Sequence, residues 1–131
     1  MKETLPKSIQ ELILSLREKL KDEPEIVDMF ERCYSNTLDT TVKKMEDGST
    51  YVITGDIPAM WLRDSVAQLR PYLVPAQNDP ELADLIAGLI RRQFMCINID
   101  PYANAFNMGP TGGEWMSDMT DMKPELHERK W

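Results

Sequence analysis

Residues 79–100, DPELADLIAGLIRRQFMCINID, are the stretch that predicts most clearly how this chain folds. Asp79 is a favoured N-cap residue, Pro80 suits the first helical position, and Glu81 adds a negative charge to the first turn. Apolar side chains then recur at helical spacing, at Leu82, Leu85, Ile86, Leu89, Ile90, Phe94 and Ile97. Arg91 and Arg92 fall outside this stripe. We therefore expect a long helix that buries the stripe and keeps both arginines off the buried line.

Further helices are predicted on the N-terminal side of this stretch. Pro6 can open one that ends near residues 21–23, and Pro24 can open the next. The apolar stripe of this second helix comprises Ile26, Phe30, Cys33, Tyr34 and Thr37. On that stripe Cys33 is expected to be a small buried hydrophobe. A shorter helix is expected over residues 64–73, with Asp64 as its candidate cap.

One short segment favours β structure. Asp47, Gly48 and Ser49 predict a turn, and the β-prone residues 50–53 follow it. The predicted fold class is therefore all-α with a short β-prone segment near 50–53. The helices offer more apolar faces than they can cover among themselves, which suggests part of a larger domain.

Composition excludes several classes of protein. The 131 residues are 42% hydrophobic and 28% charged, as in globular domains, and the net charge of −7 argues against nucleic-acid or anionic-membrane partners. The most apolar stretch is interrupted by charges, which predicts no membrane span. No secretory signal is visible, so a cytoplasmic protein is expected. Two distant cysteines and one histidine predict neither a metal site nor another cofactor.

The segment 55–65, GDIPAMWLRDS, combines a flat ring with a charged pair. Trp61 can pack against the apolar face of a sugar. Arg63 offers a planar fork of donors and Asp64 a pure acceptor, so the two can bracket adjacent hydroxyls. The structural alternative is a local ion pair at a helix start, with Trp61 in the core.

Other groups are weaker candidates for chemistry. Four carboxylates crowd a glycine-rich loop and could suggest acid/base work, at Glu114, Asp118, Asp121 and Glu125. They do not follow the ligand pattern of a calcium loop, and scattered loop carboxylates are usually solvated. His127, flanked by charged residues, is expected on a surface helix.

The sequence closely resembles the metal-independent exo-α-1,6-mannosidases of glycoside hydrolase family 125, in three motifs that follow one another in the family's order. They are ITGDIPAMWLRDS at 53–65, DPYANAFN at 100–107 and ERKW at 128–131. The resemblance runs from about residue 30 to residue 131. It implies an (α/α)6 toroid that hydrolyses terminal α-linked mannose with inversion, and hence an α-mannoside oligosaccharide as the substrate.

On this resemblance, residues 1–131 are the N-terminal part of a larger (α/α)6 catalytic domain. It places a substrate-binding set on this chain, consisting of Asp56, Trp61, Arg63, Asp64 and Asn104. The general acid and base are expected beyond residue 131, so no catalytic residue is assigned and the segment alone is expected to be inactive. Two alternatives stay open: a glucoamylase- or trehalase-like (α/α)6 hydrolase, and a non-catalytic helical interaction module.

Overall fold

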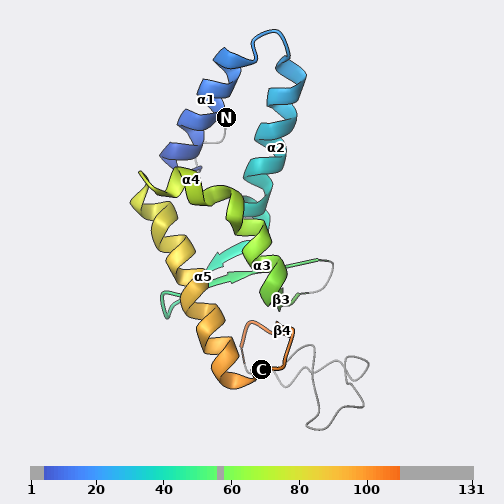
Figure 1. Cartoon of the computed structure of the whole chain (residues 1–131), viewed down its shortest axis with the longest axis vertical. Helices are drawn as coiled ribbons and strands as arrows, with labels where there is room; N and C mark the ends of the chain where they lie inside the picture. Colours follow the sequence, from blue (N-terminus) through green and yellow to red (C-terminus); the bar gives the residue numbers. More distant parts are fainter. Residues whose placement is uncertain (1–4, 56–57, 110–131) are drawn as a thin grey trace.

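The computed structural model describes residues 5–55 and 58–109. Figure 1 shows an elongated arrangement of mainly helical elements. A hairpin of α1 (Lys7–Lys19) and α2 (Pro24–Thr40) lies at one end, and the long helix α5 (Pro80–Ile99) runs toward the other. Three of the predicted helices therefore form, each with a proline at or just before its first position.

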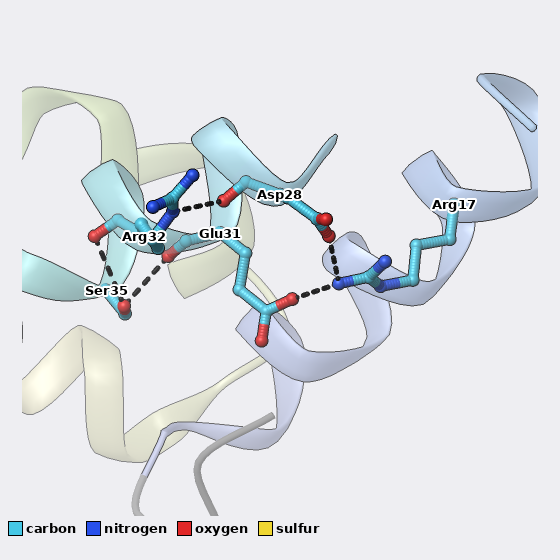
Figure 2. A network of polar contacts seen from close by, with 5 residues as sticks. All are labelled: Arg17, Asp28, Glu31, Arg32 and Ser35. Carbon is cyan, nitrogen blue, oxygen red and sulfur yellow. Dashed lines mark hydrogen bonds and ion pairs between the residues drawn. The ribbon is translucent and has the colours of Figure 1, made fainter. Parts of the chain in front are cut away.

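The α1–α2 hairpin is joined by an ion-pair network on its surface (Figure 2). Arg17 Nη2 lies 2.5 Å from Glu31 Oε2 and 2.9 Å from Asp28 Oδ1. The hydrogen bond from Arg17 lowers the pKa of the Glu31 carboxyl. Because the Arg17 and Asp28 side chains are 43% and 55% exposed, their ion pair adds little stability, whereas Glu31 is only 18% exposed.

Helix α2 packs only part of the predicted stripe against the core, because Phe30 and Tyr34 are half-buried there. Val27 and Ser35 are buried, whereas Ile26 is exposed. Cys33 is also exposed, so the prediction that it is a small buried hydrophobe is wrong. Within the predicted stripe, Phe30 packs on Tyr34 at a centroid distance of 4.7 Å, and Tyr34 contacts Tyr72.

The β-prone segment forms one strand of a hairpin. Strand β2 (Thr50–Val52) pairs antiparallel with β1 (Val42–Lys44), a strand that the sequence pattern did not indicate. The predicted turn joins them, with Gly48 at φ +75°, a conformation that glycine adopts without strain. Asp47 Oδ1 accepts a hydrogen bond from Ser49 N–H at 2.8 Å.

Helix α5 begins as predicted but buries another face along its second half. Asp79 Oδ1 accepts from Leu82 N–H at 3.1 Å, which confirms the N-cap. Leu82 and Leu89 of the expected stripe are buried. The other buried residues of the helix are Gly88, Arg92 and Cys96. Beyond Leu89 the prediction of a buried stripe is wrong, because its remaining members Ile90, Phe94 and Ile97 are exposed.

Arg92 explains why the second half of α5 turns away from the expected face. Its guanidinium is buried, lies 5.4 Å from the centre of the Tyr51 ring, and donates to Ser49 Oγ at 3.3 Å and to the Met108 carbonyl. A buried arginine with these partners keeps its charge solvated by protein dipoles and a ring face. Residue types alone place arginine outside, whereas tertiary contacts place this one inside.

A second helical stretch lies between the β1–β2 hairpin and α5 in the sequence. It comprises α3 (Leu62–Leu69), a 3₁₀ turn η1 (Arg70–Tyr72) and α4 (Leu73–Ala76). Helix α3 begins before Asp64, which therefore lies in its first turn and does not cap it, contrary to prediction. The largest fully buried side chains of the core are Tyr51, Tyr72 and Phe106.

An apolar groove of about 450 Å³ opens between α3, α4 and α5. Its exposed apolar lining includes Val66, Leu73 and Ile90. The expectation of uncovered apolar faces is therefore confirmed for the residues that the structure describes. No helix within the described ranges is both long and apolar enough to cross a membrane.

Candidate functional site

A two-stranded sheet brings together the two central sequence motifs. Strand β3 (Met60–Trp61) pairs antiparallel with β4 (Ala105–Phe106), so that Trp61 lies opposite Ala105. Immediately beyond β3, Leu62 N–H donates to the Asn104 carbonyl at 3.0 Å. The first turn of α3 is thereby joined to the loop that precedes β4, although some forty positions separate them in the sequence.

The segment leading into β3 is closed by Thr54. Its backbone N–H donates to the Ala59 carbonyl at 2.9 Å, and its Oγ1 accepts from Trp61 N–H at 2.8 Å. Gly55 next to it adopts φ +74°, which favours glycine. Asp56, one of the predicted substrate-binding residues, lies outside the described residues.

These connections form a pocket of about 430 Å³. It is lined by Trp61, Leu62, Arg63, Asp64, Pro101, Tyr102, Ala103 and Asn104. Four of the five predicted substrate-binding residues therefore line one cavity: Trp61, Arg63, Asp64 and Asn104. The pocket mixes an indole, a phenol, a guanidinium, a carboxylate and an amide, which together offer ring faces, donors and acceptors.

Arg63 and Asp64 are accessible in this pocket. Arg63 Nε lies 3.4 Å from Asp64 Oδ1, and their side chains are 90% and 45% exposed. The ion pair of the structural alternative therefore exists, but it is long and at the surface, where such pairs stabilise little. The same exposure leaves most of the guanidinium donors and carboxylate lone pairs open to a ligand.

Tyr102 is a pocket residue that the sequence-based set did not include. Its side chain is 63% exposed, and its backbone N–H donates to Asp100 Oδ1 at 3.0 Å. This turn aims the residue away from the core while Asp100 stays buried. The DPYANAFN motif contained Tyr102, but only the β3–β4 pairing places it in the same pocket as Trp61.

The other predicted chemical groups can be placed only in part. Glu114, Asp118, Asp121, Glu125 and His127 lie outside the described residues, as does the ERKW motif. Over residues 5–55 and 58–109, no group of three or more His, Cys, Asp or Glu side chains is arranged to hold a metal ion. Burial raises the pKa of the Cys96 thiol to about 11, so this cysteine is not an activated nucleophile.

Comparison with known proteins identifies the family. A family model described as metal-independent alpha-mannosidase matches residues 23–131. The chain belongs to glycoside hydrolase family 125. The match includes every residue of the pocket.

Two relatives of this family-125 chain are several times longer than it is. A solved α-mannosidase from Streptococcus pneumoniae, in a non-productive substrate complex with alpha-1,6-mannobiose, is 52% identical and superposes with a TM-score of 0.80. That alignment covers 87% of this chain and 27% of the solved one. The meiotically up-regulated gene 157 protein of Schizosaccharomyces pombe is 46% identical over 104 residues, 76% of this chain and 20% of that protein. The chain thus spans about a quarter and a fifth of these relatives.

Proposed function

We propose that this chain is part of a larger (α/α)6 catalytic domain that removes terminal α-1,6-linked mannose with inversion of configuration. Within it, the chain supplies part of the subsite for the terminal sugar. The observation that carries the proposal is the shared pocket of Trp61, Arg63, Asp64 and Asn104. Membership of family 125 and the mannobiose complex of the pneumococcal relative support the choice of substrate.

The pocket's chemistry suits a hexose at the end of a chain. A pyranose presents an apolar C–H face and a rim of hydroxyls. Trp61 and Tyr102 offer aromatic rings against which the C–H face can pack. Arg63 can donate hydrogen bonds to the hydroxyls, and Asp64 can accept them. Asn104 does both, because an amide carries a carbonyl oxygen and an NH₂ group.

The general acid and base are not assigned to the described residues. Inversion uses two carboxyl groups roughly 6.5–9.5 Å apart, with space for a water molecule beside the sugar. Among the described residues, the only acidic side chain that lines the pocket is Asp64, and it forms an ion pair with Arg63. We therefore give Asp64 a binding role and place the acid–base pair in the remainder of the domain.

The proposal is tested by following hydrolysis of α-1,6-mannobiose by the full-length protein with proton NMR. We expect β-mannose to appear first and the α anomer to grow in by mutarotation, because inversion converts the α linkage to a β product. The assay is run with and without a chelator, and we expect the same rate of hydrolysis in both. Release of α-mannose would contradict inversion, and turnover of α-glucosides instead of mannosides would favour the glucoamylase-like alternative.

A further inference from the structure

The first turn of α3, which carries Arg63 and Asp64, is bound from behind by one side chain of α5. Gln93 Nε2 donates to the Leu62 carbonyl at 3.0 Å and to Ser65 Oγ at 2.9 Å. Ser65 Oγ in turn donates to the Leu62 carbonyl at 2.8 Å. A single amide group therefore contacts the two residues that flank the pair on either side.

The pocket side of this turn is fixed independently. Leu62 N–H donates to the Asn104 carbonyl at 3.0 Å, so both polar groups of Leu62 have partners from other elements. Ser65 is fully buried and Gln93 partly so, whereas the Arg63 side chain is 90% exposed. The polar contacts thus lie on the inner side of the turn, and Arg63 projects from its outer side.

An amide is an unusual choice if this position only fills space. An apolar side chain of the same length would pack between the helices without needing partners, whereas a partly buried amide costs free energy unless it is hydrogen-bonded. What the amide adds is direction, because hydrogen bonds fix where the Leu62 carbonyl points and hence how the turn is rotated about the helix axis.

We propose that Gln93 is a positioning residue for the Arg63–Asp64 pair, and this rests on the function proposed above. Gln93 sets the rotation of the first turn of α3, and that rotation sets the direction from which the guanidinium and the carboxylate meet the sugar. A misplacement of about 1 Å in a substrate-positioning group can lower activity about 100-fold. Gln93 itself does not line the sugar pocket.

The test uses two substitutions that keep the shape of the side chain. In the full-length protein, Gln93→Met removes the donor, and Gln93→Glu sets a carboxylate against the Leu62 carbonyl. We expect kcat/KM on α-1,6-mannobiose to fall about 10-fold in Gln93→Met and further in Gln93→Glu. Gln77→Met and Gln77→Glu make the same exchanges at an exposed residue beyond α4 and should leave kcat/KM unchanged.

A double-mutant cycle separates positioning from general destabilisation. If Gln93 acts through the pair, Gln93→Met should lower kcat/KM much less in an Asp64→Ala background than in the wild type. Full additivity of the two losses would overturn the proposal. So would wild-type kcat/KM in both Gln93 variants.

Backbone amide exchange of the peptide that contains residues 61–66 gives a readout that needs no activity. We expect faster exchange in Gln93→Met than in the wild type or Gln77→Met. If the wild type fails to hydrolyse mannobiose while exchange responds as expected, the proposed function fails and the role of Gln93 in fixing this turn is supported. Unchanged exchange would overturn the positioning role whatever the activity.

Discussion

At the residue scale, two surface ion pairs of the same length can be compared to distinguish a role in sugar binding from a role in stability. Arg63 Nε lies 3.4 Å from Asp64 Oδ1, and Arg91 Nη2 lies 3.4 Å from Asp84 Oδ1. Both pairs are at the surface, where such contacts contribute about 0–1 kcal/mol. Only the first lines the pocket. Arg91 Nη2 also donates to the Gly48 carbonyl at 2.8 Å, so substituting Arg91 removes a contact between α5 and the β1–β2 turn. Equivalent substitutions in the two pairs should therefore differ in their effect on sugar binding.

The planar fork of Arg63 is the first feature to test in this way. Arg63→Lys keeps the charge but loses the paired donors, so we expect kcat/KM for α-1,6-mannobiose to fall about 10-fold. Arg91→Lys is the matched control and should retain wild-type kinetics. Steady-state assays of the full-length variants decide this, provided that both melt like the wild type. Equal kcat/KM for the two variants would return Arg63 to a purely structural role.

At the element scale, the position of α5 depends on its close approach to the β1–β2 hairpin. A Cβ atom built on Gly88 would lie 2.4 Å from Thr50 Oγ1 and 3.1 Å from both the Gly48 carbonyl oxygen and Thr50 N. No ordinary side chain fits at these distances. The glycine therefore allows α5 to rest on β2, which in turn places Gln93 behind the pocket.

We predict that Gly88→Ala destabilises the full-length protein. Overpacking typically costs about 1–3 kcal/mol, and the better helix propensity of alanine returns up to about 1 kcal/mol. The loss should shrink when Thr50→Ala removes the nearest atom. Urea unfolding of the single and double variants measures both effects. A Gly88→Ala protein as stable as the wild type would show that α5 does not lie this close to β2.

Asp79 links the start of α5 to α1 as well as capping it. Its Oδ1 accepts from Leu82 N–H and its Oδ2 from Ser8 N–H, each at 3.1 Å. Burial alone would raise the pKa of this carboxyl, but the hydrogen bonds from Ser8 and Leu82 hold it below its usual range. The charged form is therefore the one that stabilises the fold.

The sign of this shift predicts the pH dependence of an Asp79→Ala variant. A lowered pKa contributes stability that is full above the unfolded value of about 3.9 and is lost as pH falls through the folded value. We expect Asp79→Ala to cost about 1 kcal/mol at pH 7 and less below pH 4. Asp79→Asn still caps but cannot ionise, so it should cost less at pH 7, and its stability difference from the wild type should also shrink as the wild-type carboxylate is protonated. Urea unfolding curves between pH 3 and pH 7 test this. A difference in free energy of unfolding between the wild type and Asp79→Ala that grows as the pH falls would contradict it.

The predictions from sequence succeeded where the deciding contacts are local. The Asp79 cap, the turn at Gly48 and the helix starts at proline depend on residues a few positions apart. The buried face of α5 could not be predicted, because Arg92 is held by Tyr51, Ser49 and Met108, distant in sequence. The same limit concealed Tyr102, whose place in the pocket follows from the β3–β4 register.

At the scale of the whole molecule, the described part of the chain leaves an apolar groove open to solvent. Its volume is about 450 Å³, and Ile90 on its wall is 51% exposed. Val66 and Leu73 on its other walls are 49% and 51% exposed, and apolar side chains gathered at a surface in this way favour association with other protein. A chain that spans 27% of its solved relative is consistent with such a surface.

We predict that the isolated 131-residue chain self-associates through this groove and hydrolyses no mannobiose. Ile90→Asn should weaken association about fivefold, corresponding to roughly 1 kcal/mol for a half-exposed aliphatic side chain. Leu14→Asn is the matched control, since Leu14 on α1 is also 51% exposed but lies outside the groove. Sedimentation equilibrium of the three chains measures this. A monodisperse monomer with measurable turnover would contradict it.

The central claim, that this pocket binds the terminal mannose, is tested most directly by the kinetics of Asp64→Ala in the full-length protein. Removing a charged hydrogen-bond acceptor costs about 1.5–3 kcal/mol, so kcat/KM for α-1,6-mannobiose should fall about 10- to 150-fold. Asp84→Ala, which breaks the matched surface pair, should leave kcat/KM unchanged. Equal, near-wild-type kcat/KM in the two variants, with both melting like the wild type, would contradict the claim.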